Sequence, residues 1–173
     1  MTMTRVFDAR ARVLGDDINT DYIIASIRKR ETLDESVLKR YLLEAIDPAF
    51  ASSVQPGDVL VAGKNFGCGS AMEVAATVIV AAGIQAVLAK SFSRTFYRNA
   101  INNGLTPLQC DTSGIHERHA LEIACGADRS TVTNRSTGVT VDGLAMPSIM
   151  LDILGMGGLV EYVKRYGRIG NDS

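Results

Sequence analysis

One stretch decides the fold class: GKNFGCGS, residues 63–70, lies between a strand-like and a helix-like segment. The preceding VLVA, residues 59–62, is compact, apolar and partly β-branched, which predicts a buried strand. The following AMEVAATVIVAAG, residues 71–83, is apolar on almost every side, which predicts a buried helix that ends at Gly83. A strand, a glycine-rich loop and a helix in this order are typical of an α/β domain.

The alternation of short apolar runs and amphipathic segments continues on both sides of this unit. Strands are expected at 8–13, 85–90 and 105–110, with a hairpin at 130–133 and 139–141. A helix is expected at 33–46, after a Thr32–Glu35 capping box. A short helix is expected to begin after its cap, Ser91 or Ser93, and to end at 102–104. Two more are expected across 115–125 and over 159–163. We therefore predict one domain over 1–173, composed of an opening strand (1–13), a loop region (16–32), an α/β core with the Ser70 loop (59–110), and C-terminal helices with a hairpin (111–173).

Composition and charge exclude several functional classes. The 18 basic and 19 acidic residues are mixed along the chain and give a net charge of −1, so a nucleic-acid partner is not expected. The N-terminus lacks the apolar core of a signal peptide, and no apolar run approaches the roughly 20 residues that cross a bilayer. We expect a cytoplasmic protein with no membrane partner.

The cysteines do not form a recognisable ligand set. Cys68, Cys110 and Cys125 are odd in number and far apart, which fits neither a disulfide framework nor the clustered spacing of a zinc or iron–sulfur site. His116 and His119 have no acidic or cysteine ligands nearby and are interpreted as surface residues. The chain alone is predicted to hold no metal.

The 63–70 loop has the composition of an anion-binding turn, because glycines let the backbone approach a ligand closely. Ser70 and Glu73 match an S-x-x-E capping box, which would surround Ser70 with free backbone N–H groups and the positive end of a helix. The serine either caps the helix or acts as a reagent, and position alone favours the cap.

Three familiar glycine motifs do not fit this loop. A dinucleotide-binding loop needs a third glycine where Met72 stands, and a phosphate-binding P-loop needs Ser or Thr where Asn65 follows Lys64. A nucleophile elbow needs its serine between two glycines, whereas Ser70 is followed by Ala71. A nucleotide-binding domain is therefore disfavoured.

Several separate blocks, in order, resemble one family over nearly the whole chain. The blocks are GDDINTDYII (15–24), DPAFA (47–51), QPGD (55–58), GKNFGCGS (63–70), AKSFSRTFYRNAINNGL (89–105) and GGLVEYV (157–163). Together they closely resemble the small subunit of 3-isopropylmalate dehydratase and its homoaconitase and citramalate-type relatives. The resemblance implies a swivelling β/β/α domain of the aconitase type.

The resemblance also implies a partner and a reaction. A large subunit would carry a [4Fe–4S] cluster and form a heterodimer or heterotetramer with this chain, which itself holds no cofactor. The complex would dehydrate a hydroxy dicarboxylic acid and rehydrate it in the other orientation. The default is the interconversion of 3- and 2-isopropylmalate in leucine biosynthesis. Citramalate, maleate, dimethylmalate or homoaconitate chemistry, or a non-catalytic regulatory paralogue, are the alternatives.

The family motifs assign roles to individual residues. Ser70 matches the general base, which takes a proton from the carbon beside a carboxylate, and the N–H groups after Gly69 would stabilise its alkoxide. Substrate contacts are expected from Thr20, Asp21, Gly69, Ala71 and Met72, and structural support from Asn65, Gly67, Cys68 and Glu73.

The chain departs from the family beside the serine. The family pattern G-x-G-S-S-R-E-H-A reads GCGSAMEVA here, so Ala71 and Met72 replace a serine and an arginine. The missing arginine is a fixed positive charge that could hold a substrate carboxylate. The family's specificity loop, within 16–32, offers replacements: Arg28 is the first candidate and Arg30 the second.

Overall fold

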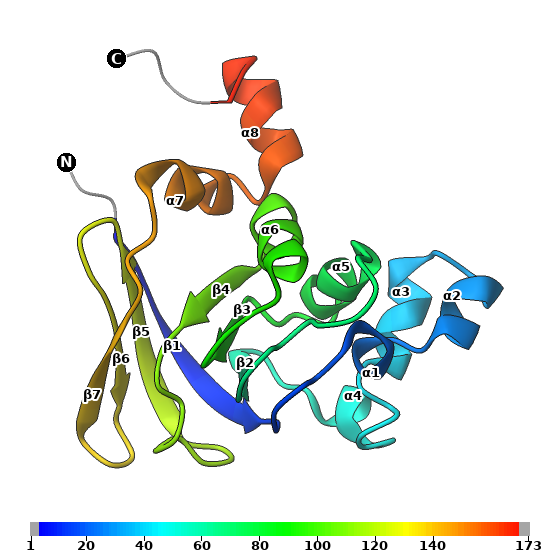
Figure 1. Cartoon of the computed structure of the whole chain (residues 1–173), viewed down its shortest axis with the longest axis horizontal. Coiled ribbons are helices and arrows are strands. Elements are labelled where there is room, and N and C mark those ends of the chain that lie inside the picture. The colour runs from blue at the N-terminus through cyan, green and yellow to red at the C-terminus, as the bar shows by residue number, and fades with distance from the viewer. Residues whose placement is uncertain (1–3, 170–173) are drawn as a thin grey trace.

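The computed structural model describes residues 4–169, which form a curled seven-stranded sheet with helices around it (Figure 1). The strands are β1 (Thr4–Val13), β2 (Asp58–Ala62), β3 (Ala86–Ala89), β4 (Thr106–Gln109), β5 (Ala120–Gly126), β6 (Ser130–Asn134) and β7 (Val139–Gly143). Their order across the sheet is β4-β3-β2-β1-β5-β6-β7. The α/β fold class expected from the sequence is confirmed.

Strand β1 joins a parallel half of the sheet to an antiparallel half. It pairs in parallel with β2, and β3 and β4 continue that half, whereas β5 pairs with it in antiparallel fashion and leads into the β6–β7 hairpin. The sheet curls until its two edges meet, because Cys110 forms an antiparallel bridge with Gly143 and the Leu144 N–H donates to the Gln109 carbonyl at 2.9 Å. The result approaches a closed barrel.

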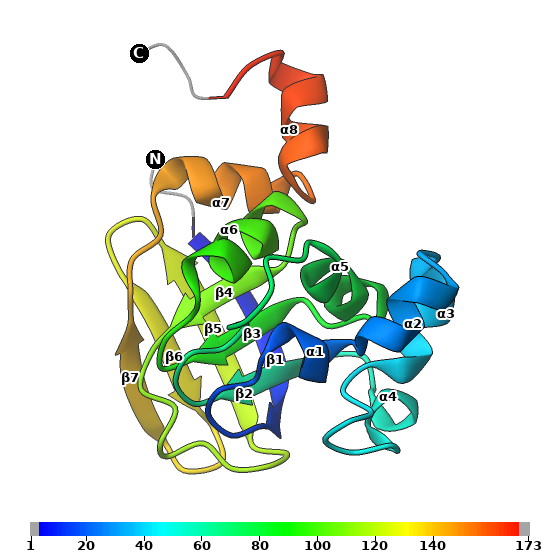
Figure 2. The same ribbon diagram turned by 45° about the vertical axis from the view of Figure 1, so that its right-hand side comes forward.

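Helices pack on both faces of the parallel half. They are α1 (Thr20–Ile23), α2 (Ser26–Glu31), α3 (Glu35–Leu38), the 3₁₀ turn η1 (Lys39–Tyr41), α4 (Phe50–Ser53), α5 (Val74–Ala81), α6 (Arg94–Asn102), α7 (Ser148–Gly155) and α8 (Leu159–Tyr166). Alternate residues of β2 point to two hydrophobic clusters, Leu60 to the α1–α5 side and Val59 to the α7 side. Figures 1 and 2 show α1–α4 grouped on one side of the molecule, away from α7 and α8. Among residues 4–169, no helix has both the length and the apolar composition that a membrane span requires.

The helix predicted over 33–46 is wrong in extent. It is broken into α3 and η1, and Leu43 adopts a positive φ of 56° and donates its N–H to the Ile23 carbonyl at 2.9 Å. Tertiary packing therefore overrides helical periodicity, since Leu42 and Leu43 are both fully buried. The cap also differs from the expected capping box, because the side chain of Asp34 accepts from the Ser36 N–H.

The helix predicted across 115–125 is also wrong, because β5 occupies Ala120–Gly126. Leu121, Ile123 and Cys125 are buried at a spacing of two, the period of a strand, and the segment pairs with β1 along seven residues. The remaining strands and the 130–143 hairpin lie within a few residues of their predicted positions. Ser93, one of the two predicted caps, begins α6 by accepting from the Phe96 N–H.

A buried charge cluster fixes the start of β2 against β1. The Asp58 carboxylate is fully buried and accepts from Arg10 Nε at 2.8 Å, Arg12 Nη1 at 3.1 Å and the Gln55 N–H at 2.9 Å. Burial by itself raises the pKa of Asp58, but the Gln55 N–H and the two guanidinium groups outweigh it and hold that pKa below its ordinary value.

We expect Asp58→Asn to lower the free energy of unfolding by about 3 kcal/mol, because the change removes the buried anion shared by Arg10 and Arg12 and leaves the buried Arg12 guanidinium with only the half-exposed Glu117. Urea unfolding at neutral pH measures this loss. Asp142→Asn is the matched control: its pair with Arg129 is exposed, so less than about 1 kcal/mol is expected. Since the folded-state pKa of Asp58 is lowered, the difference from wild type should shrink as the pH falls through that pKa. Equal losses in both variants would contradict this assignment.

Candidate functional site

Three loops meet at one edge of the sheet. They are residues 14–19 after β1, 63–73 after β2 and 90–93 after β3. Because these three strands are parallel neighbours, their carboxyl ends lie together, which is where open α/β sheets usually bind ligands. The glycine-rich loop is the middle one of the three.

Backbone hydrogen bonds fasten the glycine-rich loop to both neighbours. The Gly67 N–H donates to the Ile18 carbonyl at 2.8 Å, and the Phe66 N–H donates to the Ser91 carbonyl at 3.0 Å. In return, the Ser93 hydroxyl donates to the Gly67 carbonyl at 2.9 Å. The loop is therefore fixed at its base, which holds the residues that follow at a defined position.

Two glycines allow the loop to turn so tightly. Gly67 and Gly69 have φ angles of +79° and +95°, a region that L side chains rarely adopt. A Cβ on Gly67 would lie 2.2 Å from Cγ of Phe96, so only glycine fits at this position. At Gly69 a Cβ would only touch Asn19 and Thr20 at 3.5 Å, so the angle, and not the space, favours glycine there.

Ser70 is exposed, and its hydroxyl has no hydrogen-bond partner among the described residues. The capping-box prediction for Ser70 and Glu73 is wrong, because α5 begins at Val74 and Glu73 is its N-cap without a side-chain cap bond. The backbone N–H groups of residues 68–74 likewise donate to no described acceptor. A free hydroxyl and a row of free N–H groups next to a helix N-terminus form a surface that suits an anion.

The other predicted residues of this region lie around the loop. Thr20 donates its N–H to the Cys68 carbonyl at 2.9 Å and its hydroxyl to the Ser70 carbonyl at 3.1 Å. Asn65, at φ +61°, donates its side-chain amide to Asp17 Oδ1 at 3.1 Å. Asn65 and Thr20 thus brace the loop from the β1 side. Glu73 and Ala71 are exposed, and Cys68 is half-buried.

Neither predicted arginine contacts the Ser70 loop. Arg28 is held by Glu44 through Nε at 2.8 Å and Nη2 at 3.2 Å, and its guanidinium lies 3.8 Å from the centre of the Tyr41 ring. Arg30, two residues further along α2, is exposed. The substrate-contact role of Arg28 and Arg30 therefore remains a prediction.

Lys29, the basic residue between these two arginines, does contact the Ser70 loop. The sequence analysis did not include it among the candidate site residues. Lys29 contacts the Met72 sulfur with its Nζ and lies 3.6 Å from Asp21 Oδ1, and its side chain is only 6% exposed. Asp21 Oδ1 also accepts from the Ser26 hydroxyl at 2.7 Å. The one available signal was helical geometry, since successive residues of a helix point in directions about 100° apart and the three cations cannot share a face.

Comparison with known proteins now assigns the family. The sequence profile of the Aconitase C-terminal domain family matches residues 19–113, which is more than half of the chain and includes the loops after β2 and β3. The chain belongs to this family. Its matched region ends shortly after β4, so the profile covers strands β2–β4 and helices α1–α6.

Relatives of the same family match almost the full length. The 3-isopropylmalate dehydratase small subunit 2 of Archaeoglobus fulgidus is 44% identical over 92% of this chain and 96% of its own length. The methanogen homoaconitase small subunit of Methanocaldococcus jannaschii is 41% identical over 92% of each chain. A solved structure of 3-isopropylmalate dehydratase from the same organism superposes with a TM-score of 0.87 at 40% identity, covering 94% of this chain and 96% of that one. The small-subunit fold expected from the sequence is confirmed.

The cysteines of this aconitase-family chain are poor metal ligands. Burial raises the pKa of the Cys110 thiol to about 12 and that of Cys125 to about 11, so both remain protonated at neutral pH, whereas metal binding needs thiolates. Within residues 4–169, no group of three or more His, Cys, Asp or Glu side chains is placed to hold a metal ion. A [4Fe–4S] cluster does not fit these residues.

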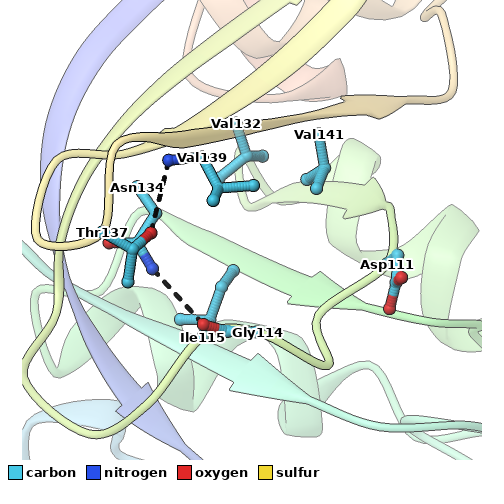
Figure 3. A pocket seen from close by; sticks show the side chains of 8 residues that line it. All are labelled: Asp111, Gly114, Ile115, Val132, Asn134, Thr137, Val139 and Val141. Carbon is cyan, nitrogen blue, oxygen red and sulfur yellow. Dashed lines mark hydrogen bonds between the residues drawn. The ribbon is translucent and has the colours of Figure 1, made fainter.

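A small cavity on the other half of this aconitase-family domain is a weaker candidate site. Figure 3 shows it beneath the β6–β7 hairpin, with Val132, Val139 and Val141 on one side and Ile115 on the other. Its volume is about 120 Å³. That is below the roughly 300 Å³ at which ligand pockets usually begin, and no charged group except Asp111 lines it. This cavity is therefore a weaker candidate than the Ser70 loop.

Proposed function

We propose that the chain is the small subunit of a cytoplasmic two-subunit hydro-lyase that interconverts 3- and 2-isopropylmalate in leucine biosynthesis. The observation that carries the proposal is the free Ser70 hydroxyl on a rigidly held loop, in a chain 44% identical to a 3-isopropylmalate dehydratase small subunit. A hydroxyl without an internal partner is available to a substrate.

Ser70 is the proposed general base. Its oxygen, as the alkoxide, takes the proton from the carbon beside a substrate carboxylate. The electron pair of that C–H bond forms the C=C bond, and the hydroxyl on the neighbouring carbon leaves. Readdition of water to the unsaturated acid at the other carbon, with the serine returning its proton, gives the isomer.

The loop lowers the energy of the charges in this reaction. The free N–H groups of residues 68–74 and the N-terminus of α5 place positive partial charges near Ser70, which favour both its alkoxide and a substrate carboxylate. Thr20 holds the Ser70 carbonyl and so fixes the backbone that carries the hydroxyl. Gly69, Ala71, Met72 and Asp21 line the same surface and are proposed as substrate contacts, with Arg28 or Arg30 requiring a rearrangement to join them.

The proposal includes a large partner subunit. Ser70 lies on an open surface, and the neighbouring α1–α3 segment exposes Tyr22, Ile27 and Leu33 at 45%, 60% and 76%, which a partner could cover. A [4Fe–4S] cluster, which we assign to that partner, would act as a Lewis acid on the substrate hydroxyl. A heterodimer or heterotetramer is the proposed assembly.

One specific observation favours a second substrate. A homoaconitase small subunit is 41% identical to this chain, nearly as similar as the isopropylmalate enzyme at 44%. Met72 also stands where the family that the sequence resembles is expected to carry an arginine. The same chemistry on homoaconitate, citramalate, maleate or dimethylmalate is therefore the alternative, because side chains that surround the substrate decide between such acids by a few contacts. The other alternative is a regulatory paralogue that binds the large subunit but does not take part in catalysis.

The test is an assay of the chain co-purified anaerobically with its large subunit. Each acid is offered in turn, and the unsaturated product is followed by its ultraviolet absorbance. We expect turnover of one acid by the complex and none by this chain alone. A cluster-loaded complex that converts none of these acids would contradict the hydro-lyase proposal and favour the regulatory paralogue.

A further inference from the structure

A groove of about 520 Å³ is lined by residues of α6, the end of β4 and α7. Figures 1 and 2 show α6 and α7 side by side. The floor of the groove is apolar, because Ile101 and Ile153 are buried there and Ile149 and Met150 are half-buried. Its volume lies within the roughly 300–1,000 Å³ that is usual for ligand pockets. The groove is therefore large enough for a small organic molecule.

Two exposed cations stand at this groove. Arg94 and Arg98 line it one helical turn apart on α6, and neither side chain forms an ion pair or hydrogen bond with another residue of 4–169. Like charges at this spacing repel each other, and Arg94 also lies at the positive N-terminal end of α6. No acidic residue of the described part of the chain lines the groove. An anion bound between the two guanidinium groups would relieve their repulsion.

Polar side chains with unused hydrogen-bonding capacity lie in the same groove. The Tyr97 hydroxyl has only the Met150 sulfur, at 4.0 Å, as a partner among residues 4–169, and a thioether is a weak acceptor. The side-chain amides of Asn102 and Gln109 form no hydrogen bond with another described residue. An apolar floor with a few convergent polar groups is the usual composition of a small-molecule site.

The groove is separate from the Ser70 loop. Phe96, which lies against Gly67, is on the opposite side of α6 from Arg94 and Ile101, because the residues that line the groove recur at a spacing of three and four. Of the three loops that meet beside Ser70, only the last contributes to the groove, through Phe92. A ligand in the groove would therefore occupy a second site.

We propose that this groove binds an amphipathic carboxylate. Its carboxylate lies between Arg94 and Arg98, since a guanidinium matches a carboxylate in both charge and geometry. Its apolar chain covers Ile149, Met150 and Ile153, and the apolar area removed from water adds to the affinity. The site is independent of the hydro-lyase function, because none of the residues proposed for that chemistry lines the groove.

The first test is calorimetric titration of the full chain with octanoate, which has a carboxylate and an apolar tail. We expect one octanoate to bind per chain. Octanamide keeps the tail without the charge and should bind about tenfold more weakly, and acetate, which lacks the tail, should show no measurable binding. Absence of octanoate binding, or equal affinities for octanoate and octanamide, would overturn the proposal.

Variants locate the bound octanoate. Replacing both Arg94 and Arg98 by methionine should weaken octanoate about tenfold and leave the affinity for octanamide unchanged, because only the charge interaction is lost. Arg40→Met, which removes an exposed arginine of η1, is the matched control and should bind octanoate as wild type does. Ser70→Ala should also bind octanoate unchanged. Weaker binding in Ser70→Ala would place the octanoate at the Ser70 loop and overturn the second site.

Ile149→Asp tests the groove without removing an arginine. Ile149 is the second residue of α7, where a carboxylate suits the helix N-terminus, so folding should be retained. The new charge would repel a bound carboxylate and compete for the arginines, and we expect octanoate to bind at least about tenfold more weakly. Wild-type affinity in this variant would contradict the placement of the ligand.

The same titration in the complex with the large subunit separates a ligand site from a protein interface. We expect the complex to bind octanoate with the affinity of the chain alone. Loss of octanoate binding when the large subunit is present would overturn the small-molecule assignment and identify the groove as part of the subunit interface. Neither result depends on whether the complex turns over a hydroxy acid.

Discussion

Ser70→Ala is expected to lower kcat of the reconstituted complex by about 10³-fold and to leave its assembly unchanged. A positioned general base contributes about 10²–10⁴-fold to the rate. The hydroxyl makes no internal hydrogen bond, so its removal should not affect folding. The measurement is the steady-state rate of the complex with one acid as substrate, at concentrations above KM.

Two controls make this result specific to the base. Ser52→Ala removes another exposed hydroxyl, far from the loop on α4, and should keep full activity. Urea unfolding of the isolated Ser70→Ala chain should match wild type within about 0.5 kcal/mol. A Ser70→Ala complex with nearly wild-type kcat would remove Ser70 from the mechanism, whatever the substrate.

The sequence predicted the strand–loop–helix unit well because its signals are local. VLVA is buried on both faces of the sheet, and Gly83 follows the end of α5 with a φ of +89° that suits glycine. The helix itself is buried on one side only, because Val80 is 38% exposed. The order of strands and the way the sheet closes could not be predicted, since the Cys110–Gly143 bridge joins segments that no local pattern connects.

The two wrong helices have different causes. In 33–46 the helical period was present, but the burial of Leu42 and Leu43 against α1 required a positive φ that no propensity scale anticipates for leucine. In 115–125 a period of two was present in Leu121, Ile123 and Cys125, and the helical interpretation overlooked it.

The glycine-rich loop lies between a strand and a helix as expected, but its detail differs from the expectation. The motif placed Ser70 beside a helix start, yet the helix begins later and leaves the serine without a capping role. The choice among the three cations of α2 depended on where Glu44 and Met72 lie in space, and neither position can be read from the order of residues. Local sequence therefore indicated where the loop lies, and tertiary packing decided which side chains surround it.

Gly67→Ala should lower the free energy of unfolding by about 4 kcal/mol and kcat/KM of the complex by at least about 100-fold. The new Cβ would lie 2.2 Å from Cγ and 2.3 Å from Cβ of Phe96, a ring that is 2% exposed and packs edge-on against Phe66 at 5.0 Å. Relief of that overlap adds about 1–3 kcal/mol to the strain of a positive φ, and it displaces the loop that positions Ser70.

Gly83→Ala separates the collision from the backbone strain. Its φ of +89° is close to the +79° of Gly67, but a Cβ there would meet no atom within 4 Å. We therefore expect a loss of only about 1 kcal/mol and full activity from Gly83→Ala. If both variants lose the same stability and both stay active, the contact with Phe96 does not hold the loop. If only Gly67→Ala loses activity and the larger amount of stability, the close packing of Gly67 on Phe96 aligns the serine. Backbone strain could not explain that difference, because it is common to the two positions.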